Sequence, residues 1–591
     1  MASISPSKYS SKRFIYTPIA ALIGGFSVCA YAAVPPGAGD FSRQVQQNMP
    51  RQNMDIARPP LSFSPEKTPA EMTDTTPGMQ VYIKKVIFTG LPDGISAVSI
   101  LALQKEVAGE LNKEHSFSSL EGMARRITNY LRGNGLIAAR AVLPPQSIRN
   151  GELSIRIIPG HYDHARIHND SGLKTALAGR IVNATTPVGD VVTLAQIERE
   201  ALLLNEIPGV EALVGIMAGQ KTGTTTPDIT LKKSREMGGY VGLDNQGDRT
   251  TGRNRVIAGA YASNLAGSGD LLRVDLLDAY EKSELMNGAL DYSLLAGDGL
   301  GTRVGMNYSR LNYRYNVNAL AFRGHSDSWG VYTIYPLVRT ARARVDTRVD
   351  VAYQSLTDKY PAVYNYGGDS KGRKEAALGT VSVTGIINSL PGGLTRFGIN
   401  GTRGTVSPRS EISRSLADFA GSSGPFMRLN YQLNHEQAIA GPLSFYAGIN
   451  GQIASHNLDP SQKFLMGGPS GVRAYDTGDG TVDEGAVATV ELRSRWNISL
   501  PGMVGRTTQL TLAPFYDQGW GEQYRNNRTA GGHTRSLDNN LNFSGAGIYS
   551  SLGEAGNYQL TLTWAHKTGH SDPNAIRNER DRVWFTAVKS F

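Results

Sequence analysis

One arginine in a glycine-rich stretch carries a charge that a simple connecting loop would not need. Residues 467–480 read GGPSGVRAYDTGDG, a composition that predicts a loop, with Arg473 near its middle. Farther along, Asp517 lies within residues 515–519, FYDQG, at the end of a predicted strand. Because the planar guanidinium of arginine grips a carboxylate through two parallel hydrogen bonds, we predict that Arg473 pairs with Asp517 and holds the loop in place. Tyr475 is expected to pack beside this pair.

A short pattern suggests a serine hydrolase but lacks the surroundings that this chemistry requires. Residues 368–372, GDSKG, match G-x-S-x-G, yet a nucleophile elbow lies between a buried strand and a helix. Here YNYG precedes and RKE follows, which predicts a charged hairpin tip. The chain also contains no P-loop pattern, so no nucleotide is expected to drive it. We predict no catalytic residue, no cofactor and no enzymatic activity.

Metal-binding patterns are incomplete as well. His435 and Glu436 begin an H-E-x-x-H pattern, but Ile439 stands where the second histidine belongs. The aspartates of the glycine-rich stretch do not have the spacing of an EF-hand, because Gly478 occupies a ligand position. Those aspartates are Asp476, Asp479 and Asp483. We therefore predict no metal site.

The loop and the later strand together resemble two motifs of the two-partner secretion transporters (TpsB), the haemolysin secretion/activation protein family (ShlB/FhaC/HecB-like). In that family an inward-folded loop carries V/I-R-G-Y and meets F-x-D-x-G on the barrel wall. The loop motif here is Val472, Arg473, Ala474 and Tyr475, and the wall motif is Phe515, Asp517 and Gly519. Ala474 replaces the usual glycine, which narrows the backbone conformations open to the loop. The family belongs to the superfamily of the barrel-assembly insertase.

Length and composition agree with a barrel rather than with membrane helices. Beyond the N-terminus of this 591-residue chain, no apolar run approaches the roughly 20 residues that a membrane helix needs. The strands of a membrane barrel contain no such apolar run, because their lipid-facing and lumen-facing residues alternate. The net charge of +9 comes without a basic helix or an RNA-binding aromatic signature. We predict a solvated surface or a cationic lumen and no nucleic-acid partner.

The N-terminus has the three parts of an export signal. A basic region precedes a short apolar core at residues 19–28, and Ala30 and Ala32 form a small-residue cleavage site. We predict a signal peptide over residues 1–32. It contains Cys29, the only cysteine of the chain, so the mature protein would have none, as suits an oxidising compartment. A lipoprotein signal at Cys29 is the weaker alternative.

A short polar helix and a proline-rich segment follow. Within residues 33–49, Asp40 can cap a helix that places Phe41, Val45 and Met49 on one side, at spacings of four residues. The resemblance implies that this helix is a plug inside the barrel. Residues 50–79 contain six prolines, which preclude regular structure and predict a linker. The alternative is a disordered tail.

Residues 80–159 predict a first small α+β unit. A strand is expected over residues 81–88, and Ser118 with Glu121 forms a capping box for a helix. The apolar face of that helix consists of Leu120, Ala124, Ile127 and Leu131. The later pattern "LPPQ…G.L.I" is similar to that of a POTRA domain.

A second such unit is predicted over residues 160–235. It begins with a strand at 165–168, continues with a helix capped by Thr193 and Gln196, and ends with a strand at 228–231. Two tandem units look like a pair of POTRA domains. The alternative is two α+β modules of another kind.

From residue 236 to the C-terminus, apolar and polar residues alternate in segments of about ten residues, as in Tyr558–Trp564. Counting these segments predicts a transmembrane β-barrel of about 16 antiparallel strands. The glycine-rich stretch belongs to an inward loop, 456–484, between the eleventh and twelfth strands. A terminal strand with Trp584 and Phe591 resembles the signal by which outer-membrane barrels are recognised for assembly, and its pairing with the first strand would remove the sheet edge.

The resemblance implies a function. The chain would be a bacterial outer-membrane transporter whose POTRA-like units in the periplasm capture one large unfolded exoprotein, a haemolysin, adhesin or contact-dependent toxin, for translocation, with or without its activation. Its other partners would be the lipid bilayer and the barrel-assembly machinery. The alternatives are a barrel-assembly insertase and a passive porin. Two POTRA-like units with a plug favour secretion, and a porin would need no POTRA domain.

Overall fold

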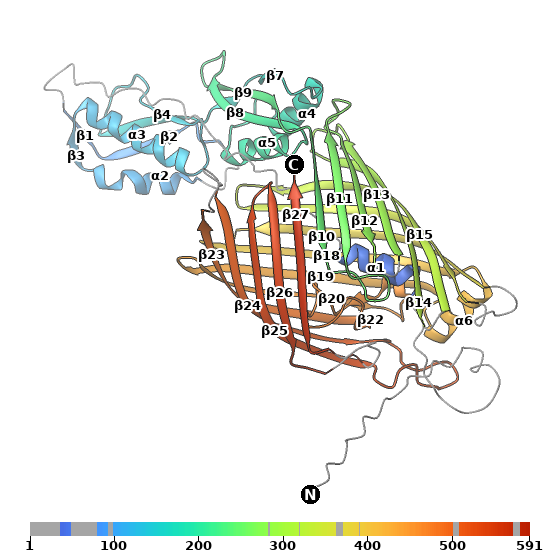
Figure 1. Cartoon of the computed structure of the whole chain (residues 1–591). Coiled ribbons are helices and arrows are strands. Elements are labelled where there is room, and N and C mark those ends of the chain that lie inside the picture. The colour runs from blue at the N-terminus through green and yellow to red at the C-terminus, as the bar shows by residue number, and fades with distance from the viewer. Residues whose placement is uncertain are drawn as a thin grey trace, which may run out of the picture.

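The computed structural model describes residues 36–48, 80–92, 98–281, 284–317, 320–361, 370–388, 390–499, 507–570, 572 and 579–591. The predicted signal peptide with its cleavage residues Ala30 and Ala32, Met49 and the linker 50–79 lie outside these ranges. Residues 368 and 369 of the GDSKG pattern do so too. The described chain forms a closed barrel, two small α+β units at one end of it, and a helix inside it (Figure 1).

Sixteen antiparallel strands close the barrel, which confirms the predicted fold and strand number. The first and last strands pair through Tyr240 with Ser590 and onward to Asp244 with Thr586. In chain order the strands are β10 (Met237–Asp244), β11 (Arg255–Ser263), β12 (Leu271–Ala279), β13 (Glu284–Leu295), β14 (Arg303–Val317), β15 (Leu320–Arg339), β16 (Ala343–Lys359), β17 (Lys371–Ile387), β18 (Gly393–Pro408), β19 (Gly424–Ala440), β20 (Leu443–Ala454), β23 (Glu484–Ile498), β24 (Thr508–Glu522), β25 (Asn540–Glu554), β26 (Tyr558–Lys567) and β27 (Asp581–Ser590).

Alternation along the strands sorts lipid-facing from lumen-facing side chains. On β24, Leu512 and Tyr516 are exposed on the outside, whereas Thr511 and Asp517 are buried inside. On β23, Trp496 points outward in the same way. Because only one face meets lipid, polar residues on the other face have water or other polar groups to bond to.

The first α+β unit has its own apolar core. Its elements are β1 (Val81–Ile83), β2 (Lys85–Thr89), α2 (Ile100–Val107), the 3-10 turn η2 (Ala108–Glu110), β3 (Lys113–His115), α3 (Phe117–Gly133), β4 (Arg140–Val142) and β5 (Glu152–Ile158). The single strand expected over 81–88 is wrong: β1 pairs with β3 and β2 pairs with β5. Ser116, not Ser118, caps α3, since its side chain accepts from the N–H of Ser119.

The second unit also has its own core and rests on turns of the barrel. It contains β6 (His161–Tyr162), β7 (Arg166–Asn169), α4 (Thr175–Thr185), α5 (Leu194–Asn205), β8 (Val210–Ala218) and β9 (Thr224–Lys233). The predicted capping box of Thr193 and Gln196 is present. Arg339 Nε of the barrel donates to Glu206 Oε2 at 2.7 Å, and Arg180 Nη1 donates to the carbonyl of Gly297 at 2.9 Å. These contacts fix the unit against the barrel rim.

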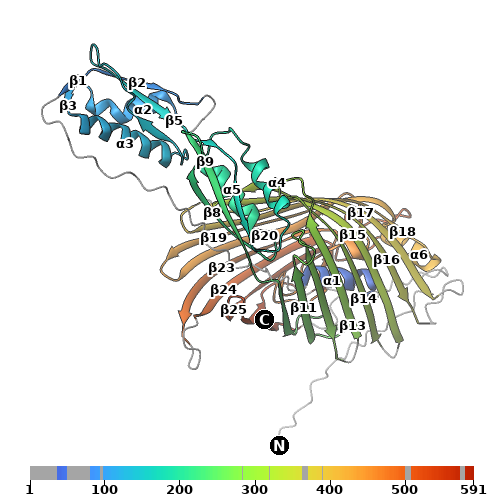
Figure 2. The same ribbon diagram turned by 90° about the horizontal axis from the view of Figure 1, so that it is seen from above.

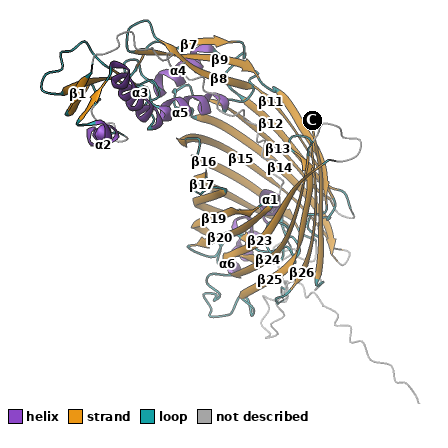
Figure 3. Ribbon diagram, turned by 90° about the vertical axis from the view of Figure 1, so that its left-hand side faces the viewer, coloured by secondary structure: helices purple, strands orange, loops and turns teal. Residues whose placement is uncertain are grey.

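The remaining elements lie in the lumen or at the end of the barrel away from the α+β units. α1 (Ala38–Asn48) lies in the lumen beside β14, as the view from above shows (Figure 2). The connection from β20 to β23 contains the 3-10 turn η4 (Pro460–Gln462) and the short strands β21 (Phe464–Leu465) and β22 (Thr481–Val482). α6 (Glu411–Ala420) lies between β18 and β19 (Figure 3). None of the described helices is long and apolar enough to cross a membrane.

Candidate functional site

The loop between β20 and β23, the eleventh and twelfth strands, folds back into the barrel. Its tip is closed by a hydrogen bond of 2.7 Å from the N–H of Val472 to the carbonyl of Met466. Val472, Ala474 and Tyr475 are all completely buried. They pack with inward-facing apolar residues of the barrel wall, among them Phe515 and Phe543. The loop is therefore a packed part of the lumen and not a surface connection.

Arg473 forms the predicted pair with Asp517. Its Nε and Nη2 donate to the two carboxylate oxygens at 2.9 and 2.8 Å, and its backbone N–H donates to Oδ2 at 3.1 Å. Nη1 donates to Glu491 Oε1 of β23 at 2.8 Å. Thr489 also donates to Asp517, at 2.9 Å. The arginine thus joins the loop tip to two adjacent strands, β23 and β24, with two carboxylates to balance its charge.

Aromatic side chains enclose the charge. The guanidinium carbon of Arg473 lies 3.4 Å from the centre of the Phe515 ring, a cation–π contact. This contact explains why an apolar residue interrupts the polar inward face of β24. Trp584 of β27 donates from Nε1 to the carbonyl of Arg473 at 2.7 Å. Trp584, predicted only as part of the assembly signal, therefore also holds the loop.

Tyr475 belongs to the same buried apolar cluster as Phe515, and its own ring and hydroxyl contacts are made with other residues. Its ring stacks on Phe543 with centres 3.9 Å apart and planes 6° from parallel. Its hydroxyl donates to the carbonyl of His570 at 2.5 Å. The ring that lies against the guanidinium is Phe515 of β24, whereas Tyr475 stacks on β25.

The alanine at position 474, where the family has glycine, is accommodated by a glycine of the wall on which the loop packs. The non-glycine residues with positive φ in the described chain are Asn112, Asn150 and Asn264, so Ala474 has a backbone conformation open to any residue. Its methyl group occupies the space that a side chain would fill at Gly545 of β25, where an added Cβ would lie 2.5 Å from it. At Gly519 of the wall motif, an added Cβ would lie 2.8 Å from Val472. Because Gly519 and Gly545 have no side chains, the loop can pack directly against the wall at both positions.

Asp476, next along the loop, reaches the junction of the first and last strands. Arg249 and Arg253, in the connection from β10 to β11, donate to it at 2.6 and 2.8 Å, and Arg582 of β27 at 2.9 Å. Glu579 completes the network through Arg249 and Arg582. The loop therefore bridges both sides of the closure. Among the described residues, no group of three or more His, Cys, Asp or Glu side chains could hold a metal ion.

The predicted lumen helix is anchored by its apolar side. Phe41 and Val45 are buried, and the Phe41 ring lies 4.8 Å from Tyr313 of β14. The N–H of Ala38 donates to Asp358 Oδ1 of β16 at 2.7 Å. Asp40 does not cap the helix as expected: it lies in the first turn, and its carboxylate accepts from the N–H of Gly37 at 2.9 Å.

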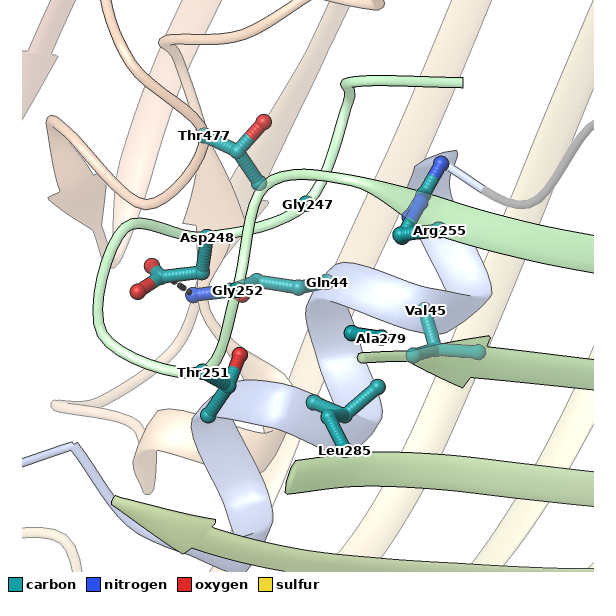
Figure 4. A pocket seen from close by; sticks show the side chains of 10 residues that line it. All are labelled: Gln44, Val45, Gly247, Asp248, Thr251, Gly252, Arg255, Ala279, Leu285 and Thr477. Carbon is teal, nitrogen blue, oxygen red and sulfur yellow. Dashed lines mark hydrogen bonds between the residues drawn. The ribbon is translucent and has the colours of Figure 1, made fainter. Parts of the chain in front are cut away.

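The polar side of α1 contacts the loop. Arg43 Nε donates to the carbonyl of Lys463, and Gln47 donates to the carbonyl of Leu465, both at 2.9 Å. Gln44 donates to Asp248 at 3.1 Å beside a small cavity that α1 shares with the β10–β11 connection and Thr477 of the loop (Figure 4). Helix and loop thus brace each other within the lumen.

Two models of known protein families match this chain. Residues 83–160 match the ShlB-type POTRA domain, and residues 223–538 match the model of the haemolysin secretion/activation protein ShlB/FhaC/HecB. The chain belongs to this family. It is an outer-membrane transporter of two-partner secretion, with its POTRA region in the periplasm. The end of the barrel away from the α+β units is therefore extracellular.

Named relatives support the assignment. The transporter is 33% identical over 485 residues to the heme/hemopexin transporter protein HuxB of Haemophilus influenzae strain 86-028NP, covering 81% of this chain and 82% of the relative. It is 23% identical over 409 residues to the outer membrane transporter CdiB of Dickeya dadantii, covering 67% and 70%. The solved structure of CdiB from Escherichia coli superposes with a TM-score of 0.69 at 18% identity, covering 94% of this chain and 99% of that one, and shows the same fold.

Sequence reasoning missed some residues of the transporter's site. Glu491 belonged to the inward set of β23 by alternation, but nothing in the sequence singled it out as a partner of Arg473. The arginines that hold Asp476 lie more than two hundred positions before it or about one hundred after it along the chain, so no local pattern connects them. Phe591, the other residue of the assembly signal, exchanges backbone hydrogen bonds with Gly239 while its ring is exposed.

Proposed function

We propose that this transporter keeps its lumen closed by α1 and the inward loop, and that a captured exoprotein displaces α1 to pass. The observation that carries the proposal is the mutual bracing of the two elements inside the barrel. Arg473 fixes the loop to the wall, and Arg43 and Gln47 fix α1 to the loop. In this arrangement the loop is a latch and α1 a plug.

The contacts of α1 suit a removable part. They are neutral or singly charged hydrogen bonds to carbonyls and carboxylates, each contributing about 0.5–3 kcal/mol, together with the burial of Phe41 and Val45. The latch instead has a buried arginine with two carboxylates. We infer that α1 leaves first and that the loop remains or moves only later.

We further propose the division of the chain that this mechanism needs. Residues 1–32 would be the cleaved signal, 33–49 the plug and 50–79 its tether. Residues 80–159 and 160–235 would be two POTRA domains that take up cargo, and 236–591 the barrel with loop 456–484. A tether of 30 residues reaches at most about 100 Å when extended, enough to pass from the lumen to the periplasm.

The cargo would be one large exoprotein, captured unfolded by strand addition to the edges of the POTRA sheets. Relatives are named for heme/hemopexin transport and as CdiB transporters. For this chain we propose a haemolysin, adhesin or contact-dependent toxin, with folding outside the cell giving direction to transport. Trp584 and Phe591 would direct the barrel to the assembly machinery.

The test is to delete residues 162–233 and express the variant together with the partner exoprotein. We expect a heat-modifiable barrel in the outer membrane and no exoprotein in the medium. The control is the double variant Lys221→Gln with Glu211→Gln in the same unit, which leaves the net charge unchanged. This variant should secrete normally. Undiminished secretion by the deletion variant would contradict cargo capture by this unit. A barrel that inserts other outer-membrane proteins instead would favour an insertase.

A further inference from the structure

Four cations lie side by side across four neighbouring strands at the extracellular end of the barrel. In the strand register Arg314 of β14 faces Arg323 of β15, Arg323 faces Lys359 of β16, and Lys359 faces Lys371 of β17. β14 runs from Arg303, beside the turn that the second POTRA unit contacts, to its opposite end (Figure 1). We call Arg314, Arg323, Lys359 and Lys371 the cation row.

The row faces outward. All four side chains are exposed, while their strand neighbours Tyr313, Phe322, Asp358 and Gly372 are buried on the lumen side. Alternation leaves no other direction, since successive side chains point to opposite faces of a strand. The cations therefore lie on the outer surface of the barrel.

The lipid boundary can be located on the same strands. Six residues before Arg314, Tyr308 faces Trp329, which in turn faces Tyr353. The rings of Tyr308 and Trp329 lie 4.2 Å apart, and the next outward residues are the exposed Met306, Val331 and Val351. Such an aromatic row above an apolar band marks the membrane interface. Six residues of tilted strand place the cation row about 15 Å beyond it, among lipid headgroups and their sugars.

Like charges directly opposite each other in a sheet repel. Glu284 faces Arg314 in the register, and Asp327, four residues from Arg323 on β15, contacts the opposite Arg310 at 3.4 Å. Within the described residues, however, Arg323 and Lys359 make no ion pair. An anion from outside the chain would relieve the repulsion between these two positive charges.

We propose that the cation row binds the phosphate groups of lipid A in the outer leaflet of the outer membrane. Guanidinium groups bind phosphate through paired hydrogen bonds, and lysines add point charges beside them. Arg373 and His325 lie one outward rung closer to the aromatic row and extend the positive surface toward the acyl chains. The location at the lipid headgroups favours this occupant over an acidic protein.

Lipid binding at the cation row would occur on the outer face of the same strands whose inner face contacts α1. Arg314 follows Tyr313, which contacts Phe41, and Lys359 follows Asp358, which accepts from the N–H of Ala38. The same strand segments thus hold lipid outside and α1 inside. This consequence rests on the proposed plug, whereas lipid binding itself does not.

The experiment uses the full-length protein in detergent and native mass spectrometry. The probes are diphosphoryl lipid A, monophosphoryl lipid A, phosphatidylglycerol and inorganic pyrophosphate. The test variant is Arg323→Gln with Lys359→Gln. The control, Arg414→Gln with Arg528→Gln, removes two exposed charges from α6 and the β24–β25 connection at the same end of the barrel.

We expect the test variant to bind diphosphoryl lipid A at least tenfold more weakly, the control to bind as the parent does, and added salt to weaken the parent's binding. Equal binding by the two variants overturns the proposal. So does pyrophosphate binding as tight as that of lipid A, which would indicate a free-phosphate site. Retained lipid A binding with lost secretion would indicate a protein contact and equally overturns it. Lys359→Gln alone, checked for heat-modifiable mobility, replaces the double variant if that one does not fold.

Discussion

The guanidinium of Arg473 contacts both carboxylate oxygens of Asp517, at 2.9 and 2.8 Å, in the interior of the barrel. Asp517 is completely buried and Arg473 is 9% exposed. Removing one partner of a buried pair costs on the order of 3–5 kcal/mol, because the other charge stays behind unpaired. Arg473 therefore makes a large contribution to the position of the loop.

We expect Arg473→Ala to reduce secretion strongly while the barrel still folds, since the sixteen-strand closure does not include the loop. Arg473→Lys should rescue only in part, because a single ammonium cannot make both hydrogen bonds to Asp517. Exoprotein in the medium and heat-modifiable mobility measure the two effects. Glu491→Gln is the matched control: it leaves the Asp517 pair intact and should have a smaller effect. Normal secretion by Arg473→Ala would show that the loop needs no latch.

A second prediction concerns Ala474 of the loop and Gly545 of β25, which lie against each other where the loop packs on the wall. Gly545→Ala should displace the loop and lower secretion, because the new methyl would lie 2.5 Å from that of Ala474. Ala474→Gly should be nearly silent alone and should restore secretion to the Gly545→Ala variant. Secretion by the two single variants and the double variant measures the coupling. Additive effects without rescue would mean that the two positions do not share this space.

Parts of this site were predictable from sequence and parts were not, for physical reasons. Alternation located the strands because lipid and lumen impose opposite demands on successive residues, and it placed Asp517 inside. The stacking of Tyr475 on Phe543 joins a loop to a distant strand, and only the folded chain brings them together. α4 was missed because no side chain caps its start: Lys174 stands at its N-cap without a capping hydrogen bond.

A third prediction concerns Asp476 and the closure of the barrel. Asp476→Asn would leave Arg249, Arg253 and Arg582 facing one another with less negative charge among them. We expect the temperature of heat-modification to fall and single-channel conductance to fluctuate more, since β10 and β27 pair over only Tyr240–Asp244. Asp538→Asn, an exposed aspartate at the same end of the barrel, is the control. An unchanged temperature of heat-modification for Asp476→Asn would contradict a role in closure.

A fourth prediction tests the plug. Deleting residues 40–48 should raise single-channel conductance in planar bilayers, because α1 occupies the lumen beside β14, β15 and β16. Phe41→Ala should do so in part: it removes the buried aromatic anchor, at a cost of about 3–5 kcal/mol for a fully packed ring. Gln46→Ala, at an exposed position of the same helix, should leave conductance unchanged. Conductance equal to that of the parent in the deletion variant would refute the plug.

The last prediction concerns Glu200, which is completely buried in the second α+β unit. Burial raises its pKa from 4.5 to about 7, while a hydrogen bond from Thr186 opposes the shift. Between these two pH values the folded unit keeps a proton that the unfolded chain has lost, so stability falls as pH rises through this range and is constant above it. The shift corresponds to about 3 kcal/mol.

We expect Glu200→Gln to remove that decline and to raise the melting temperature above pH 7, where the parent must bury a charge. The measurement is thermal unfolding of a fragment of residues 80–235 between pH 4.5 and 8. This fragment contains two apolar cores of its own. Glu198→Gln on the same helix should retain the parent's pH dependence, because its side chain is not buried. If parent and Glu200→Gln show the same slope against pH, Glu200 is ionised in the folded unit at neutral pH, and its charge must be balanced by a group other than Thr186.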